Sequence, residues 1–183
     1  NSLITSLIMR SDPRSLQILL IDPKQTAFYI YKNCPYLFVP VVPDVGKAVI
    51  WLQWLDAEVD ARLQQQNAIA AQKKRAVKKE KHASFKPPTL LVVINELADL
   101  VVEAKQVVDK TIKRIVKHGG KVGLHLIVGT QCPSETVVPE VLRSRLISQC
   151  VFHTATRAES VTLLGRDGSE KLMGVGDGLM RLA

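Results

Sequence analysis

Residues 90–100 read Leu-Leu-Val-Val-Ile-Asn-Glu-Leu-Ala-Asp-Leu, an apolar run that ends in an amide and a carboxylate. Five consecutive apolar residues are typical of a buried strand, and they leave Asn95 and Glu96 at its carboxyl end. In enzymes that transfer phosphoryl groups, such a pair helps to hold Mg²⁺ and to orient or deprotonate the attacking water. An ordinary core strand followed by a polar loop has the same pattern, so this stretch alone leaves both interpretations open.

Two further apolar runs also end in polar residues. Residues 18–21 are followed by Asp22, Pro23 and Lys24, and the run that starts at 124 ends in Thr130 and Gln131. In open parallel sheets, ligand sites form at the carboxyl ends of the strands. We therefore expect three buried strands to deliver polar side chains to one edge of a sheet.

Length and composition indicate one globular domain. The 183 residues are 46% hydrophobic, and no apolar run approaches the roughly 20 residues of a membrane span. A signal-peptide pattern is absent, and Cys34, Cys132 and Cys150 have neither metal-ligand spacing nor an even count. These features predict a chain in the reducing cytoplasm that makes no membrane contact of its own.

Strands that alternate with helices predict a parallel sheet covered on both faces. The first helix has no evident start, so we expect the chain to be the downstream part of a longer protein. Asp44 is a candidate cap for the second helix, Gly119-Gly120 is the expected end of the third, and a basic insertion or loop is expected at about 67–88. The expected helices are 1–9, about 45–66, about 101–118, about 138–146 and about 157–164; the expected strands are about 17–22, 37–42, 90–94, 124–130 and about 148–154.

Four segments follow one another in a specific order: 20–24 (Leu-Ile-Asp-Pro-Lys), 94–100 (Ile-Asn-Glu-Leu-Ala-Asp-Leu), 123–131 (Gly-Leu-His-Leu-Ile-Val-Gly-Thr-Gln) and 172–179 (Leu-Met-Gly-Val-Gly-Asp-Gly-Leu). Together they resemble the motor core of the FtsK/SpoIIIE family of bacterial DNA translocases. The resemblance implies an α/β, RecA-like P-loop NTPase core over residues 1–183, mostly parallel and with helices on both faces of the sheet. It also implies ATP and Mg²⁺ as cofactors, double-stranded DNA as partner and a hexameric ring that serves chromosome segregation or DNA transfer.

The phosphate-binding loop of that family, Gly-x-x-x-x-Gly-Lys-Ser/Thr, has no match in these residues. Gly46-Lys47 and Gly120-Lys121 contain the dipeptide, but no Ser or Thr follows either one. The expectation is a partial motor domain whose amino-terminal strand and P-loop are missing. Such a chain should not hydrolyse ATP alone, and the sequence leaves open whether the parent protein does and whether it is tethered to the cell membrane.

The resemblance assigns roles to individual residues. It implies that Glu96 is the catalytic carboxylate of the Walker B segment, that Asn95 occupies the Mg²⁺ position, and that Gln131 senses the γ-phosphate. Asp22 either supports the Mg²⁺ site or fixes its turn. Lys24, Gly174, Gly176 and Asp177 are the remaining candidates for the nucleotide side of the site.

Three positions depart from the family pattern. Asn95 stands where the family has aspartate, while Cys132 and Gln149 stand where it often has arginine. The first change predicts weaker Mg²⁺ binding, because an amide carries no charge. The others put the arginine finger in doubt. Arg143, Arg145 and Arg157 are the candidates left for that role, although the pattern favours ordinary surface ion pairing for any one of them.

The net charge of +8 suits a nucleic-acid partner. Lys105, Lys113, Lys117 and Lys121 are the candidate DNA contacts, but a solvated helix face would have the same composition. Three functions remain open: an active DNA motor, a degenerate subunit that binds DNA or acts as a scaffold, and a conjugation or secretion ATPase of the same superfamily. An engineered origin of Asn95 is also open, since exchanging the Mg²⁺ aspartate is a way to trap a motor.

Overall fold

The computed structural model describes residues 1–75, 87–146 and 148–182, so half of the basic loop predicted at about 67–88 lies outside the described residues. The chain divides into two compact units, residues 1–129 and 130–183. Within the described ranges, no helix combines the length and the apolar character that a membrane span requires.

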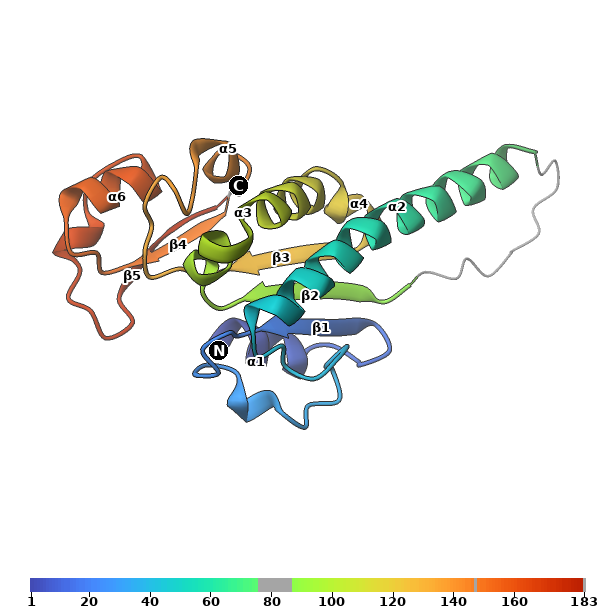
Figure 1. Ribbon diagram of the computed structural model, residues 1–183, viewed down its shortest axis with the longest axis horizontal. Helices are drawn as coiled ribbons and strands as arrows, with labels where there is room; N and C mark the ends of the chain where they lie inside the picture. Colours follow the sequence, from blue (N-terminus) through green and yellow to red (C-terminus); the bar gives the residue numbers. More distant parts are fainter. Residues whose placement is uncertain (76–86, 147, 183) are drawn as a thin grey trace. The chain divides into compact units, whose positions relative to one another are not determined.

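The first unit is built on a parallel sheet in the order β1 (Leu16–Ile21), β2 (Thr89–Ile94) and β3 (Leu124–Val128) (Figure 1). Ile21 pairs with Ile94, and Ile94 with Val128, so the three strands end level with one another. The expected alignment of their carboxyl ends is therefore confirmed.

The strand predicted at 37–42 is reduced to two isolated bridges. Leu37 pairs with Ile18 and Val42 with Ile21. Pro40 lies between the two bridges and has no N–H to give to a ladder, which accounts for the interruption.

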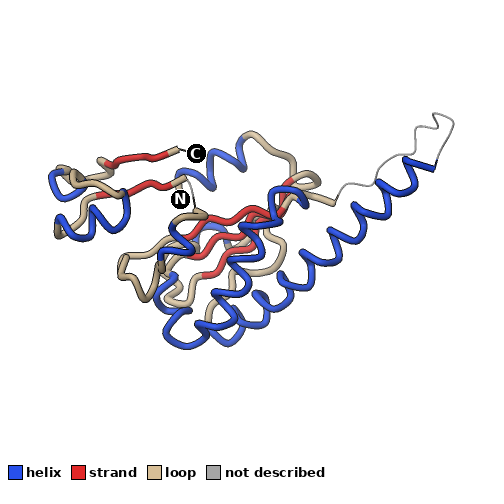
Figure 2. The backbone as a smooth tube through the Cα atoms, turned by 90° about the horizontal axis from the view of Figure 1, so that it is seen from above, coloured by secondary structure: helices blue, strands red, loops and turns tan. Residues whose placement is uncertain are grey.

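Both faces of the sheet are covered. On one face, Ile18, Leu20, Leu91 and Val93 join a core with α1 (Ser2–Met9) and with aromatic residues around η1 (Tyr29–Tyr31). Strand side chains alternate, so Leu19, Ile21, Val92 and Ile94, all fully buried, belong to the opposite face. Two long helices that pack on each other, α2 (Val45–Arg75) and α3 (Leu97–Arg114), lie on that side (Figure 2).

α2 begins as predicted, because the carboxylate of Asp44 accepts the backbone N–H of Lys47 at 2.7 Å. The helix is longer than the predicted 45–66 and reaches Arg75. Its last turns are rich in alanine, glutamine and lysine, which have high helix propensity.

Arg62 attaches α2 to the sheet. Its side chain is buried, its Nε donates to Glu58 at 2.7 Å, and its Nη1 donates to the carbonyl oxygens of Pro88 at 3.1 Å and Val122 at 3.0 Å. Pro88 immediately precedes β2 and Val122 lies just before β3. One guanidinium therefore holds the start of both strands against the helix.

The expected helix end at Gly119-Gly120 is wrong. α3 continues through a π-helical turn, η2 (Ile115–Gly119), into α4 (Gly120–Val122), and the left-handed residue that ends the helix is Gly123, with φ 71°. A Cβ on Gly119 would lie 2.4 Å from the carbonyl oxygen of Leu124. Gly119 is thus required by a close backbone approach and not by a helix stop.

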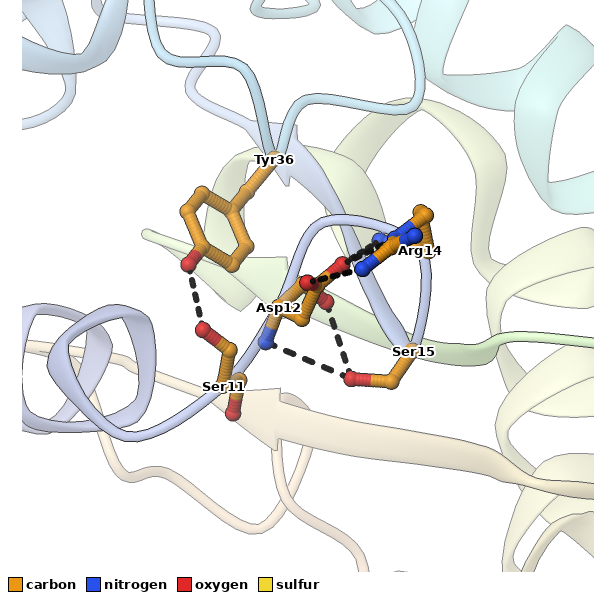
Figure 3. A network of polar contacts seen from close by, with 5 residues as sticks. All are labelled: Ser11, Asp12, Arg14, Ser15 and Tyr36. Atoms are coloured by element: carbon orange, nitrogen blue, oxygen red, sulfur yellow. Dashed lines mark hydrogen bonds and ion pairs between the residues drawn. The ribbon is translucent and has the colours of Figure 1, made fainter.

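A polar network closes the turn between α1 and β1 (Figure 3). The hydroxyl of Tyr36 donates to the carbonyl of Ser11 at 2.6 Å, and Ser15 donates to the carbonyl of Asp12 at 2.9 Å. The guanidinium of Arg14 donates to both carboxylate oxygens of Asp12, each at 3.0 Å. These bonds hold the entry to β1.

The Asp12 carboxyl should titrate unusually low. Hydrogen bonds from the side chain and then the backbone of Arg14 lower the pKa of Asp12 from 3.8 to about 2. Because the folded-state pKa lies below the unfolded value, the stabilisation is complete above pH 3.8 and is lost as the pH falls through about 2. In a carboxyl-carbon NMR titration, Arg14→Ala should raise this pKa, whereas the exposed Arg10→Ala should not.

The second unit contains a two-stranded antiparallel sheet, β4 (Gln149–Phe152) with β5 (Gly178–Arg181). α5 (Glu140–Arg143), α6 (Arg157–Leu164) and η3 (Ser169–Lys171) complete it. The bounds of α6 are as predicted, and Thr156 and Glu159 form a capping box at its start. α5 and β4 are shorter than predicted, and β5 was not predicted, because its four residues follow directly on a glycine-rich turn.

Candidate functional site

Asp22 follows β1 and is fully buried. One carboxylate oxygen, Oδ2, accepts the backbone N–H groups of Ala27 at 2.8 Å and Phe28 at 3.1 Å. These bonds fold the chain after the strand into a tight turn, in which Gln25 has a positive φ of 54°. Asp22 therefore fixes this turn, whatever else it does.

Asn95 follows β2 and lies beside Asp22. Its backbone N–H donates to the carbonyl of Ile21 at 3.0 Å, which extends the pairing of β1 and β2 by one step. Its side-chain Nδ2 donates to the second carboxylate oxygen of Asp22, Oδ1, at 3.1 Å. Among the described residues, the side-chain oxygen of Asn95 has no hydrogen-bond partner.

Glu96 is the N-cap of α3, and only 5% of it is exposed. Its Oε1 accepts the backbone N–H of Ala98 at 3.1 Å. A carboxylate at this position is stabilised by the unpaired N–H groups and the positive end of the helix dipole. The sequence pattern left Glu96 as either a catalytic carboxylate or an ordinary loop residue, and its capping role was missed because glutamate is not a preferred N-cap.

Lys24 and Asp99 connect the turn after β1 to the first turn of α3. The Lys24 ammonium lies 3.3 Å from Asp99 Oδ1, and about half of the Lys24 side chain is exposed. The other oxygen, Asp99 Oδ2, is buried without a hydrogen-bond partner among the described residues. Asp99 was not among the predicted site residues, although its place in the first helical turn, where carboxylates are favoured, is a usable signal.

Gly129 brings the end of β3 against Asn95. Its N–H donates to the carbonyl of Ile94 at 2.8 Å, and its carbonyl accepts the N–H of Leu97 at 2.9 Å. A Cβ on Gly129 would lie 2.7 Å from the backbone oxygen of Asn95. The peptide that carries Asn95 is thus held from the β1 side and from the β3 side.

These residues fit Mg²⁺ only if the ion takes most of its ligands from water and from phosphate groups. In the described part of the chain, no group of three or more His, Cys, Asp or Glu side chains could hold a metal ion. Mg²⁺ usually keeps several waters and binds through one or two protein groups and substrate phosphates. The unpartnered oxygen of Asn95 suits a contact with a metal-bound water. The buried Asp22 is hydrogen-bonded to the Asn95 amide, and the buried Glu96 follows Asn95 in the chain.

The other predicted nucleotide residues belong to the second unit. Gly174 and Gly176 have φ values of 81° and 93°, and Asp177 closes their β-turn by donating its N–H to the Gly174 carbonyl at 3.0 Å. Gln131 is exposed near the start of this unit. The structure brings Asp22, Asn95 and Glu96 together within the first unit, whereas Gln131 and the glycine turn lie in the other.

Of the arginine-finger candidates, Arg157 is paired with Asp167 at 3.5 Å. Arg143 accepts a hydrogen bond from the side chain of Gln149 at 3.5 Å through its backbone carbonyl. Arg145 is exposed. The exposed position of Arg145 leaves its side chain accessible.

The candidate DNA-binding lysines differ in their surroundings. Lys113, Lys117 and Lys121 recur every four residues, are exposed and make no ion pair with the described residues. By contrast, Lys110 is paired with Asp56 of α2 at 2.7 Å, and Arg114 with Asp56 and Asp60. Lys105 is also exposed, but it has a partner.

Comparisons with known proteins agree on one family. The model of the FtsK/SpoIIIE family matches residues 1–135. The DNA translocase FtsK of Tropheryma whipplei is 36% identical over 98% of this chain, and that of Staphylococcus aureus (strain Mu50) is 34% identical over 97%. The chain spans about a quarter of the length of these curated relatives, 25% and 24%.

Solved structures show the same fold at low sequence identity. EssC (ATPases 2 and 3) from Geobacillus thermodenitrificans has a TM-score of 0.77 at 17% identity, over 98% of this chain and 34% of that one. The pCW3 conjugation coupling protein TcpA, solved with ATPγS, has a TM-score of 0.72 at 16% identity, over 93% of this chain and 50% of that one. The predicted α/β, RecA-like fold of a P-loop ATPase motor domain is thereby confirmed.

Proposed function

Because the chain belongs to the FtsK/SpoIIIE family, we propose that it forms part of an ATP-driven motor that moves double-stranded DNA. The observation that carries the proposal is the Asn95–Glu96 pair at the carboxyl end of β2, with the buried Asp22 beside it. Two carboxylates and an amide at a shared strand edge suit phosphoryl transfer, in which positioning and charge stabilisation dominate.

In this proposal, Glu96 orients and deprotonates the attacking water, and Asn95 would help to hold Mg²⁺ through a metal-bound water. Mg²⁺ would neutralise charge on the β- and γ-phosphates. Gln131 responds to the γ-phosphate, and the turn at Gly174, Gly176 and Asp177 contributes to the nucleotide side. Hydrolysis also requires a phosphate-binding loop, which residues 1–183 do not contain, so the activity belongs to the whole protein.

We further propose a hexameric ring as the working assembly, with a trans-acting arginine among Arg143, Arg145 and Arg157. Arg145 is the favoured candidate, because its side chain is exposed while Arg157 is already paired with Asp167. The basic net charge of +8 supports a polyanionic partner.

Translocation itself tests the proposal. The whole protein, given ATP and a linear duplex that carries a short third strand, should displace that strand, and ATPγS in place of ATP should prevent displacement. A protein that binds the duplex and hydrolyses ATP but never displaces the strand would not be a translocase.

The lysines at 113, 117 and 121 are proposed to contact DNA phosphates, because no carboxylate in the described residues neutralises them. Changing all three to glutamine should reduce the slope of log K against log[salt] by about 3, since each lost phosphate contact removes about 0.9. Fluorescence anisotropy of labelled duplex at several NaCl concentrations measures this slope.

Lys110→Gln is the matched control for that experiment, because Lys110 lies on the same helix but is already paired with Asp56. It should leave the slope nearly unchanged. If the triple variant kept the original slope of log K against log[salt], these lysines would only be solvated surface residues. The DNA contacts would then lie elsewhere.

A second candidate function is a subunit that binds nucleotide or DNA without hydrolysis. Asn95 favours it, because the amide carries no charge to stabilise a divalent cation. Such a subunit would retain ATP tightly, show no DNA-stimulated phosphate release and still bind duplex DNA.

A further inference from the structure

The contact between Asp22 and Asn95 joins two strand ends that lie 73 residues apart in the sequence. Both carboxylate oxygens of Asp22 are occupied, Oδ2 by the N–H groups of Ala27 and Phe28 and Oδ1 by the Nδ2 of Asn95. The carboxylate oxygen accepts from an N–H donor, so the NH₂ group of Asn95 is the part of the amide that faces Asp22. The orientation of this amide therefore follows from its chemical surroundings.

We infer that Asp22 is a positioning residue, which orients the Asn95 side chain so that its oxygen is turned toward the divalent cation of the proposed function. The inference rests on that function. In a planar amide, the oxygen and the nitrogen are bonded to the same carbon and point in different directions, so the hydrogen bond from the NH₂ group to Asp22 leaves the oxygen free to face another partner. An oxygen in that direction can accept from a metal-bound water, whereas an NH₂ group there could not.

The pairing also predicts how exchanges at the two positions would act in this chain. Asn95→Asp alone would bring a second carboxylate to about 3.1 Å from a fully buried one, with no donor between them. Asp22→Asn alone would turn two NH₂ groups toward each other, unless Asn95 turned over and lost its outward oxygen. The double exchange restores one donor and one acceptor, and the oxygen of an asparagine at position 22 can still accept from Ala27 and Phe28.

A double-mutant cycle on the chain Asn1–Ala183 tests the pairing. Asp22→Asn and Asn95→Asp should each lower the melting temperature by about 4 °C or more, and the double variant should recover most of both losses. Asn33→Asp, at an exposed position, controls for adding a carboxylate by the same exchange and should have little effect.

Mn²⁺ alone, used as a paramagnetic probe for the cation, tests the orientation by NMR. In the unmodified chain, Mn²⁺ should broaden the amide signals of residues 95 and 96. In Asp22→Asn, the same broadening should require at least about tenfold more Mn²⁺. Mutation of a residue that orients a metal ligand typically weakens metal binding by about this factor. In the double variant, a carboxylate faces the cation. The amide signals of residues 95 and 96 should therefore broaden at an Mn²⁺ concentration no higher than in the unmodified chain.

Two results would overturn the inference, and they are distinguishable from each other. Additive losses in the cycle would mean that Asp22 and Asn95 do not act as a pair, and this result would not bear on the proposed motor function. Alternatively, the losses in melting temperature could be strongly non-additive while Mn²⁺ broadens the amide signals of residues 95 and 96 in no variant. That result would mean that Asp22 and Asn95 act as a pair but orient nothing toward a cation. Only that second result counts against the proposed phosphoryl-transfer site as well.

Discussion

Replacing Arg62 with alanine should lower the free energy of unfolding of the chain by about 3 kcal/mol, as expected when one member of a buried ion pair is removed. The loss leaves Glu58 without its partner and removes the donor to the carbonyl oxygens of Pro88 and Val122. Urea unfolding at 25 °C, followed by tryptophan fluorescence, measures the change.

Arg62→Lys provides the informative comparison. Lysine keeps the charge but cannot place one nitrogen on Glu58 and another on two carbonyl groups, so it should recover only part of the stability. Arg14→Ala, which removes an ion pair on the surface, should barely move the midpoint of the urea unfolding curve. If Arg62→Ala behaved like Arg14→Ala, the proposed attachment of α2 to the strand starts would be wrong.

Glu96→Gln in the whole protein should lower kcat for ATP hydrolysis by about 10²- to 10⁴-fold, the range for loss of a general base. Glutamine retains an oxygen that can accept the N–H of Ala98, so the cap of α3 and the fold should survive. Nucleotide affinity should change little, because the exchange removes a proton acceptor and not a phosphate ligand. Steady-state phosphate release with saturating DNA measures kcat.

Glu103→Gln serves as the matched control, because Glu103 lies exposed on the same helix. It should leave kcat unchanged. Glu96→Ala removes the cap as well, and it should lose both activity and stability. A Glu96→Gln protein that hydrolysed ATP at the original rate would show that Glu96 is only a helix cap.

The sheet could be predicted from the sequence, because each strand is a short apolar run followed directly by polar residues. The register of β1, β2 and β3 follows from those ends, and the helix that starts after Asp44 follows from a standard cap. The end of the third helix was predicted wrongly at Gly119-Gly120. A glycine pair usually signals a helix end, but at Gly119 it serves a contact with Leu124 that local patterns do not reveal.

The chemistry of the site was only partly predictable. Asn95 and Glu96 were identifiable from their place after β2, but the bond between Asn95 and Asp22 depends on strand pairing and has no local signal. Arg62 shows the same limit, since its spacing from Glu58 predicts a modest surface pair. Its burial and its bonds to two distant carbonyl groups make it a central structural residue.

In the proposed function, this chain contributes a hydrolytic site to a DNA motor. The first measurement is DNA-stimulated ATP hydrolysis by the whole protein with Asn95 unchanged. We expect double-stranded DNA to raise phosphate release severalfold and Glu96→Gln to abolish the stimulated rate. Tight nucleotide binding without phosphate release, with or without DNA, would rule out hydrolysis at this site and identify the protein as a non-hydrolysing member of its family.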